Sequence, residues 1–349
     1  MSRTLIALAL VGGCACTPGP DVVVVGTREL GEVAAAEGVS SRTGGHSLFA
    51  FGRSIWLFGD TQLTTPDSQG VRERANSWSF TSDLGAEDGL DSFETRTDAW
   101  GGPAELLIPT ADELAFNQAQ PPDGERLLVA PMTAVRDDTN GRVVVFYAKS
   151  RRSALGSITP LGSGVAIWTA LDDDPIRPVL DAGSDEPTLL FHAPEPGFGQ
   201  AALILNERLY AYACSEALYQ PCVVARVELG QLFERAAWRF WTGREWSPNL
   251  ADAVAVLEAA TVLSVHFNFH VNRYLALYSE ATSGAIELRF APTPEGPWSP
   301  PTRVLDGDSA RADGLIHAEL RRAAGQLEYF SYRRDGSLHL VELELAAGE

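Results

Sequence analysis

The sequence predicts an all-β fold, and within that class a five-bladed β-propeller. The first observation is a unit of one apolar strand, one short polar turn and one aromatic strand, which occurs five times at intervals of roughly 50 to 90 residues. The second is that the later strand of each unit is apolar on both faces, as a middle strand packed between two blades would be. The third is that the apolar residues show no helical period, which a helical solenoid would need.

Each unit begins with the strand that is expected to line the central axis. In the first unit, residues 45–53 lead into the apolar strand 55–60, where Gly59 lets the backbone bend before Asp60. The other units pair an inner with a middle strand in the same way: 132–135 with 143–147, 200–205 with 209–214, 263–267 with 274–280, and 316–320 with 327–333. Asp60 therefore ends a strand, either as a turn residue before Thr61 or as a functional carboxylate.

This repetition argues for a single domain over residues 21–349. Of the 349 residues, 45% are hydrophobic, 21 are Pro and 32 are Gly, a composition that suits a loop-rich globular β-fold. A propeller closes when its last strand pairs beside its first, so we expect residues 338–345 to lie next to a strand at 21–25. The protein is expected to contain almost no helix and to be a monomer.

The charge of the chain excludes several classes of partner. Its formal net charge is −19 and its Lys and Arg residues form no cluster, so neither a nucleic acid nor an anionic membrane surface is an expected partner. The sequence also has no P-loop, no dinucleotide-binding fingerprint and no G-x-S-x-G nucleophile motif. We therefore expect no cofactor.

The N-terminus is typical of an export signal. Residues 1–13 contain Arg3, a short apolar stretch and small residues before Cys14, and this pattern resembles a bacterial lipobox. The resemblance implies that Cys14 carries a lipid, that residues 14–20 form a tether, and that Ala15 favours the outer membrane. The alternatives are a short signal cleaved elsewhere and a start that is not cleaved. No later stretch of the sequence is long enough to be a membrane-spanning helix.

Two of the remaining cysteines are expected to form a disulfide. Cys214 and Cys222 flank a short loop after the third middle strand, and export makes oxidation feasible. Closing this loop would stabilise the fold by about 2–3 kcal/mol. A metal site is the weaker interpretation and we predict none, although His266 and His270, four residues apart on one strand face, leave a cation site open.

Polar side chains interrupt the inner strands of the five units. They are His46, Ser47, Thr133, Arg136, Asp137, Asp138, Gln200, His266, Asn268, His270, His317 and Glu319. Each alone could be a satisfied polar group at a channel mouth, but strands of different blades meet at the axis, where propellers bind ligands. Because His317 and Glu319 are two residues apart, we expect them on one strand face. We predict substrate-binding roles for His46, Gln200, Asn268, His270 and His317.

Aromatic side chains add a second criterion for a sugar ligand. Sugars stack on aromatic rings and offer hydroxyl groups to Asp, Glu, Asn and His side chains. The chain has eight Trp, most of which should pack between blades. Trp78 and Trp100, expected in loops beside the first unit, are the candidate platforms, and Trp78 is predicted to bind substrate.

The order of several short motifs carries a family resemblance. They are WLFGDT at 56–61, NSW at 76–78, WRFWTGREW at 238–246, NRYLALYS at 272–279, GPWS at 296–299 and HAEL at 317–320. In this order they make the chain similar to the five-bladed propellers of domain-of-unknown-function family 4185 and its relatives, some of which are endo-D-arabinanases. The resemblance covers most of the chain after the signal, and it implies Asp60 and Glu319 as a catalytic pair.

Two functions are consistent with this resemblance. The first is a surface-anchored glycoside hydrolase acting on an arabinan-like polysaccharide, in which Asp60 is base or nucleophile, Glu319 is the acid and His317 orients it. The second is a non-catalytic glycan-binding or adhesion lipoprotein on the same scaffold. Hydrolase-like relatives tend to have an acidic residue in a segment R-D-G-G, where residues 42–45 of this chain read R-T-G-G, with Thr43 in place of the acid. Glu319, Glu280 and Asp137 are the alternative sources of that carboxylate.

Overall fold

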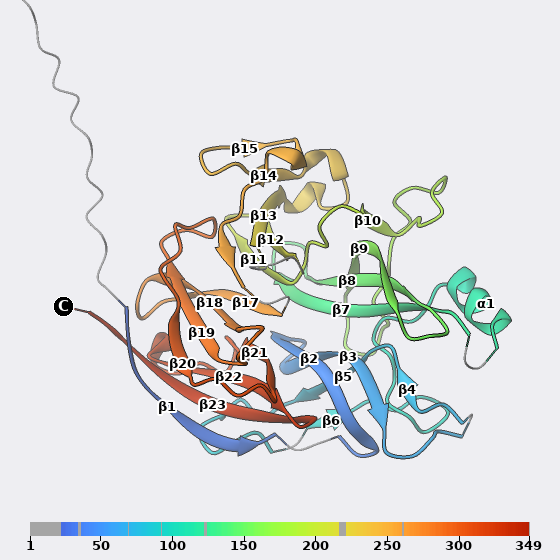
Figure 1. Ribbon diagram of the computed structural model, residues 1–349, viewed down its shortest axis with the longest axis horizontal. Helices are drawn as coiled ribbons and strands as arrows, with labels where there is room; N and C mark the ends of the chain where they lie inside the picture. The colour runs from blue at the N-terminus through green and yellow to red at the C-terminus, as the bar shows by residue number, and fades with distance from the viewer. Residues whose placement is uncertain are drawn as a thin grey trace, which may run out of the picture.

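The computed structural model describes residues 22–33, 36–68, 70–91, 93–121, 124–215, 221–259 and 262–348. Its strands form five antiparallel sheets around a common centre, which confirms the predicted five-bladed β-propeller (Figure 1). The colour bar of Figure 1 follows the chain once around this ring, from the blue blade 1 through green and yellow to the red blade 5. The five inner strands therefore come from five separate parts of the sequence.

Blades 1 and 2 form the first part of the ring. Blade 1 has the order β2-β3-β5-β6, with β4 also paired to β3, and blade 2 has the order β7-β8-β9-β10 counted from the inside. The bounds are β2 Val39–Ala50, β3 Arg53–Leu63, β4 Glu73–Arg74, β5 Ser77–Thr81, β6 Glu94–Thr95, β7 Arg126–Asp137, β8 Arg142–Arg152, β9 Ile158–Trp168 and β10 Leu189–His192.

Blades 3, 4 and 5 complete it. Blade 3 is enlarged, with the order β11-β12-β13-β14-β15 and β16 paired to β13, whereas blade 4 is β17-β18-β19-β20 and blade 5 is β21-β22-β23-β1. The bounds are β11 Ala201–Leu205, β12 Arg208–Cys214, β13 Pro221–Glu228, β14 Arg239–Trp241, β15 Trp246–Ser247, β16 Leu257–Glu258, β17 Leu263–Asn268, β18 Arg273–Ser279, β19 Ile286–Ala291, β20 Thr302–Leu305, β21 Arg311–Ile316, β22 Leu327–Arg334, β23 Ser337–Ala347 and β1 Val22–Glu32.

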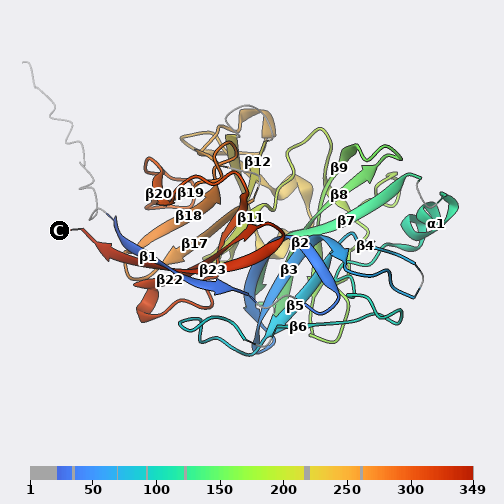
Figure 2. The ribbon, with the colours of Figure 1, turned by 60° about the horizontal axis from the view of Figure 1, so that its bottom comes forward.

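The ring closes by pairing the two ends of the chain. β1 runs antiparallel to β23, with Val22 opposite Ala347 and Val24 opposite Leu345. Both views show the blue β1 beside the red β23 (Figures 1 and 2). The expected closure between residues 338–345 and the N-terminal strand is thereby confirmed for the described residues, while Asp21 lies outside them.

Tight hairpins set the register between inner and middle strands. In blade 3, Leu205 pairs with Arg208, so Asn206 and Glu207 alone form the turn. Both residues have positive φ angles, 50° and 60°. Two such residues give the turn that follows the natural twist of the flanking strands, and Asn is among the residues that best tolerate this conformation. The sequence therefore fixes where β11 ends and β12 begins.

The middle strands are buried on both faces, as predicted. In β3, the side chains of Ile55, Trp56, Leu57 and Phe58 are all buried in succession. A strand with one face in water would instead alternate between buried and exposed residues. Each middle strand therefore lies between two neighbouring blades.

Aromatic side chains fill the interface between blades 1 and 2. The Trp168 ring lies edge-on to Trp78 with centroids 5.1 Å apart and edge-on to Phe51 at 5.0 Å. The Trp168 indole also donates a hydrogen bond to the Asp173 carbonyl oxygen at 2.8 Å. This packing holds the first two blades against each other.

Helix is a minor part of the described residues. The single α-helix, α1 (Ala111–Ala119), begins at Thr110, whose hydroxyl accepts from the Glu113 amide while the Glu113 carboxylate accepts from the Thr110 amide. Four short 3-10 helices are Leu229–Gln231, Arg235–Ala237, Leu250–Asp252 and Ala323–Gly325. None of the helices in the described part of the chain has the length and apolar character needed to cross a membrane.

The inner strand of blade 5 corrects one prediction. The sequence placed it at residues 316–320, but β21 spans Arg311–Ile316. The His317 amide still donates to the Tyr329 carbonyl oxygen at 2.8 Å, but the Leu320 amide then donates to the His317 carbonyl oxygen at 2.9 Å and closes a turn. His317 and Glu319 therefore do not share the face of a strand, and the expectation that they do is wrong.

The packing between blades 1 and 2 yields a stability prediction. Replacing Trp168 with Ala should lower the free energy of unfolding by about 3–5 kcal/mol, because it removes a fully buried indole and leaves a cavity. Chemical denaturation followed by circular dichroism measures this change. The matched control is Trp100→Ala, because Trp100 is 51% exposed and its loss should change stability by less than about 0.5 kcal/mol. Equal effects of the two substitutions would contradict the packing described for Trp168.

Candidate active site

The five inner strands surround a central cavity of about 730 Å³. It is lined by the later halves of β2, β7, β11 and β17 and by the turn that follows β21. The titratable side chains that line it are His46, Arg136, His266, Glu319 and Arg321, joined by the hydroxyl groups of Ser47, Thr133, Ser264 and Tyr274. Among the described residues of the lining, Glu319 is the only acidic one.

Glu319 is held at the cavity wall by hydroxyl groups of blade 1. The Ser54 hydroxyl donates to Glu319 Oε1 at 2.7 Å, and the Trp56 indole donates to the Ser54 oxygen at 2.9 Å. Burial raises the pKa of the Glu319 carboxyl, although its hydrogen bonds with Ser47 and Ser54 and the charge of His266 act in the opposite direction. A carboxyl that keeps its proton at higher pH is suited to act as a proton donor.

His317 lies behind the cavity wall and bonds to Ser47, a neighbour of Glu319. Its Nδ1 is 2.6 Å from the Ser47 hydroxyl, its Nε2 is 2.8 Å from the Ser331 hydroxyl, and its ring packs on Trp56 with centroids 3.9 Å apart. Burial and the neighbouring His46 hold the pKa of the His317 imidazole well below its usual range. When the neutral ring donates from Nδ1 to Ser47 and accepts from Ser331, the Ser47 hydroxyl can donate to Glu319. His317 thus lies behind the cavity wall and does not line the cavity.

A second titratable group, His266, lies on the wall formed by β17. Its Nε2 is 3.0 Å from Oε1 of Glu328, a fully buried carboxylate of β22. The Asn268 amide donates to the same oxygen at 2.6 Å and to the Gly325 carbonyl oxygen at 2.7 Å. A carboxylate acceptor places the imidazole proton on Nε2, so Nδ1 keeps its lone pair. No described residue bonds to that Nδ1.

Aromatic side chains form one side of the cavity mouth. The Phe267 ring is edge-on to Phe269 at 5.2 Å and to Tyr274 at 5.0 Å, and all three line the cavity. Phe269 is 62% exposed in the turn between β17 and β18. An exposed ring beside polar groups is the kind of surface on which a sugar stacks.

Asp60 is not part of this cavity. It lies within β3, which continues to Leu63, so the expectation that Asp60 ends a strand is wrong. It is six residues from Ser54, which corresponds to about 20 Å at the rise of a β-strand. Because Ser54 contacts Glu319 directly, the two carboxyls are much farther apart than the roughly 5–9.5 Å of glycosidase pairs. The predicted catalytic pair of Asp60 and Glu319 is therefore wrong as a pair. At Asp60, burial and the neighbouring Glu73 raise the carboxyl pKa, with Arg152 acting against them.

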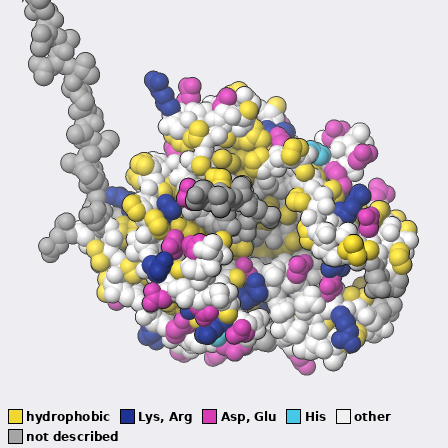
Figure 3. Space-filling model, viewed as in Figure 1, with side chains coloured by type: hydrophobic (Ala, Val, Ile, Leu, Met, Phe, Trp, Pro, Cys, Tyr) yellow, Lys and Arg dark blue, Asp and Glu magenta, His cyan; other side chains and the backbone are white. Residues whose placement is uncertain are grey.

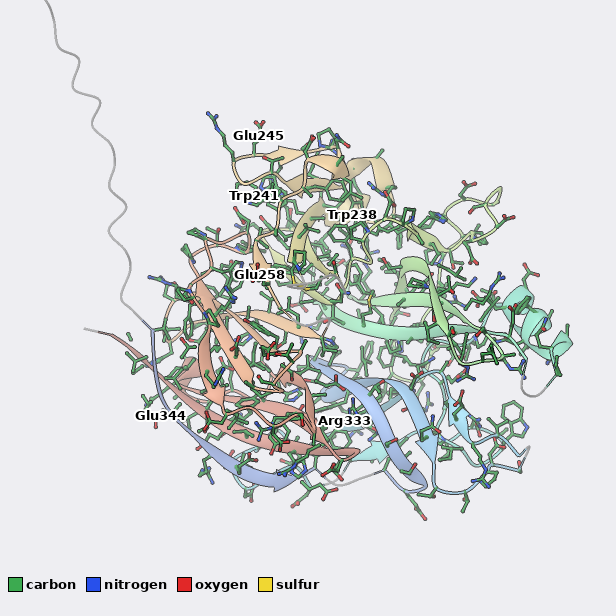
Figure 4. The ribbon with its side chains drawn as sticks, in the orientation of Figure 1. Trp238, Trp241, Glu245, Glu258, Arg333 and Glu344 are labelled. Atoms are coloured by element: carbon green, nitrogen blue, oxygen red, sulfur yellow. A yellow bond between two sulfur atoms is a disulfide. The ribbon has the colours of Figure 1, made fainter. Side chains whose placement is uncertain are left out.

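His46 does reach the cavity, as expected, but as a buried neutral group. Burial lowers the pKa of its imidazole to about 4, against the opposing charge of Asp313. The Asp313 carboxylate accepts from the Gly44 amide at 3.1 Å and from Arg333 Nε at 2.9 Å. Arg333 lies between blade 5 and β2 (Figure 4). These contacts join blades 1 and 5 next to the cavity.

Four other predicted ligand residues lie elsewhere. Trp78 is buried in β5 against Trp168, so its ring offers no surface to a sugar and its predicted loop position is wrong. The Gln200 amide is bonded to the backbone N–H and C=O of Cys214, which extends the pairing of β11 and β12. His270 is exposed in the turn after β17, and the Asn268 side chain is bonded internally. None of the four lines the central cavity.

One of the two cysteine predictions can be compared with the structure. Cys214 and Cys222 face each other across β12 and β13 and form the expected disulfide, with an S–S distance of 2.04 Å. Cys14, the predicted lipidation site, lies outside the described residues. No group of three or more His, Cys, Asp or Glu side chains that could hold a metal ion occurs in the described part of the chain.

Sequence comparison identifies one family. Residues 173–327 match DUF4185, a domain of unknown function. The match includes His266 and Glu319 but ends before Glu328, and it supports the family resemblance for this part of the chain. No curated protein matches the chain.

Structural comparison finds hydrolases with the same architecture. A putative hydrolase from Bacteroides ovatus superimposes with a TM-score of 0.60 at 13% identity, over 89% of this chain and 86% of the other. A family 117 glycoside hydrolase from Zobellia galactanivorans gives 0.52 at 10% identity, over 91% and 90%. An exo-β-1,3-galactanase from Phanerochaete chrysosporium, solved with β-1,3-galactotriose, gives 0.50 at 12% identity, over 92% and 63%. At such identities the similarity establishes the fold alone.

Sequence patterns assign no role in the site to two of these residues. His266 is expected among the polar groups at the axis and at an open cation site but not as a substrate-binding residue, and Glu328 falls in a middle strand that is expected to be apolar. The bond between them joins residues 62 positions apart in sequence. Only the placement of blade 4 beside blade 5 brings them together.

The raised pKa of Glu319 has a consequence for stability. The folded protein binds a proton at Glu319 more tightly than the unfolded chain, whose carboxyl has the ordinary pKa of 4.5. Stability therefore falls as the pH rises from that value through the folded pKa. Glu319→Gln removes this loss, so the variant should gain stability relative to the wild type as the pH increases from 4 to 7, measured by denaturation at each pH.

The control is Glu280, whose pKa is shifted in the opposite direction. Hydrogen bonds from Ser283 and Thr282 lower the pKa of Glu280 to about 2. Glu280→Gln should therefore be less stable than the wild type at neutral pH, and the difference should shrink as the pH falls through 4.5 towards 2. A Glu319→Gln profile parallel to that of the wild type would contradict the raised pKa.

Proposed function

We propose that this protein binds a carbohydrate in its central cavity and hydrolyses a glycosidic bond there. The observation that carries the proposal is the position of Glu319, a partly buried carboxyl with a raised pKa that faces the same cavity as the aromatic cluster of Phe267, Phe269 and Tyr274. A sugar stacked on these rings would present its glycosidic oxygen to an acid. The family 117 glycoside hydrolase and the exo-β-1,3-galactanase of similar fold support a carbohydrate ligand.

In this mechanism Glu319 donates its proton to the glycosidic oxygen. The bond between the anomeric carbon and that oxygen breaks as the leaving sugar takes the proton. A water molecule attacks the anomeric carbon and gives its own proton to Nδ1 of His266, whose Nε2–H is held by Glu328. Glu319 ends ionised and His266 ends protonated, so one proton transfer between them through solvent restores the starting state.

The hydroxyl groups around Glu319 fix where its proton lies. With Ser54 donating to Oε1, the carboxyl proton is on Oε2. Ser47, oriented by His317, supplies a further hydrogen bond that strengthens when Glu319 becomes ionised. These residues act through Glu319 and do not contact the sugar.

Non-catalytic glycan binding is the second candidate function. It is favoured by the absence of a second carboxylate among the described residues of the cavity wall and by Thr43, which stands where hydrolase-like relatives have an acid. The aromatic cluster and the hydroxyl groups of the cavity would bind a glycan equally well without cleavage. The two candidates differ only in the release of product.

A panel of neutral oligosaccharides distinguishes these functions. We expect the purified protein to bind at least one of the arabino-, xylo- and galacto-oligosaccharides by calorimetry, and to release shorter products detected by chromatography. Glu319→Gln should lower turnover at least about a hundredfold while binding is retained, because the amide keeps the shape of the side chain but cannot act as an acid. The control is Glu245→Gln, since Glu245 is exposed on the turn between β14 and β15 (Figure 4).

Three results would change this account. Product release by Glu319→Gln at the wild-type rate would contradict the assigned acid. Binding without any product would favour the non-catalytic function. Failure of every glycan to bind would contradict both candidates.

Export and anchoring form a separate part of the proposal. The lipobox-like sequence before Cys14 supports transport out of the cytoplasm and attachment to the outer membrane by a lipid. Cys14→Ser should then move the protein from the detergent-soluble membrane fraction into the periplasm or the medium. Cell fractionation with immunoblotting measures this change. A distribution identical to that of the wild type would contradict the anchor.

A further inference from the structure

The central cavity differs in charge from the protein as a whole. The chain has 46 acidic and 27 basic residues. Figure 3 shows acidic side chains over much of the viewed face, with Lys and Arg scattered among them. The described residues that line the cavity include two Arg, Arg136 and Arg321, and one acid, Glu319. The excess of basic groups is therefore local to the cavity.

Arg321 has no ionic partner within the described residues. One of its guanidinium nitrogens, Nη1, donates to the Phe267 carbonyl oxygen at 3.1 Å, and its guanidinium carbon is 4.8 Å from the centroid of the Phe269 ring. No described residue accepts a hydrogen bond from its Nε or Nη2. These contacts fix the guanidinium group beside the exposed aromatic ring and leave donors unused.

The neighbouring arginines are engaged differently. Arg322 donates to the carbonyl oxygens of Leu84, Leu320 and Arg321, so it ties the turn to blade 1. Arg136 pairs with Asp138 at 2.6 Å, in an exposed ion pair on the β7–β8 turn. Arg321 is thus the cavity arginine whose charge no described side chain balances.

An unbalanced arginine next to an aromatic platform matches an acidic sugar. A guanidinium group binds a carboxylate through two parallel N–H···O bonds and binds a sulfate in a similar manner. We propose that the glycan bound in the central cavity carries an acidic group, a uronate carboxylate or a sulfate ester, and that Arg321 binds this group while Phe269 stacks on the sugar ring. This inference rests on the proposed function, because it concerns the ligand of the same cavity.

The two acidic groups nearest the cavity are separated from such an anion in different ways. Glu328 Oε1 is bonded to His266 and Asn268, and the fully buried side chain lies behind the wall of the cavity. Burial of Glu319 favours its neutral form, which carries no repulsive charge. The net charge of −19 nevertheless acts on ligands outside the cavity. A short acidic oligosaccharide or a single acidic chain end therefore suits this protein better than a long polyanion.

Calorimetry with matched ligands tests the inference. The probes are tri-galacturonic acid, a sulfated galactan oligosaccharide and neutral arabinotriose and galactotriose, each titrated into the purified full chain. We expect at least one acidic probe to bind about tenfold or more tightly than the neutral probes, and the identity of that probe tells a carboxylate from a sulfate ester. Arg321→Gln should weaken acidic binding by about 10- to 100-fold and leave neutral binding within about threefold, because only the charged hydrogen bonds are lost.

Two further variants control for charge and folding. Arg321→Lys keeps the positive charge and should retain part of the acidic preference. Arg244→Gln removes an exposed arginine from the β14–β15 turn and should change nothing. Equal affinity of the wild type for acidic and neutral probes, or an acidic preference that survives in Arg321→Gln, would overturn the inference while the proposed function stands. Failure of all probes to bind would overturn the proposed function and this inference together.

Discussion

Burial of the middle strand of each blade on both faces is the constraint on which the rest of this structure depends. β3, β8, β12, β18 and β22 each lie between two neighbouring blades, so their side chains are mostly apolar or aromatic and are packed on both sides. This packing leaves only strand ends, hairpin turns and the central axis for polar groups that must stay near solvent. Polar side chains of β2, β7 and β17 therefore line one central cavity, whereas those of Gln200 and Asn268 are bonded within the fold.

The closure of the ring positions the most important group in that cavity. Glu319 belongs to the turn after β21 in blade 5, but its hydrogen bonds come from Ser54 and Ser47 in blade 1. Those blades are joined by the Asp313 contacts to Gly44 and Arg333, while pairing of β1 with β23 completes blade 5 itself. Glu319 is therefore set by contacts between the first and the last blade. Its environment exists only in the complete ring.

The sequence was sufficient for the fold because the decisive signals are local. Apolar residues on both faces of 55–58, and the Asn-containing turn at 206–207, can each be recognised within a few residues. The residues of the site were harder to predict from the sequence. A carboxylate on a strand can lie near the axis or far from it, and the sequence around Asp60 does not distinguish these positions, nor does it show that β3 continues to Leu63. The prediction that Trp78 lies in a loop is wrong for a similar reason. Trp78 is buried because Trp168 of blade 2 packs against it, and this contact cannot be seen in the sequence near Trp78.

The proposed mechanism requires a glycan in the central cavity between Glu319 and the ring of Phe269. A crystal structure of the Glu319→Gln variant with a bound oligosaccharide tests this most directly. The account predicts a sugar ring stacked on Phe269 with its glycosidic oxygen within hydrogen-bond distance, about 3 Å, of the side chain at position 319. A sugar bound near Asp60, at the other end of β3, with an empty central cavity would contradict it.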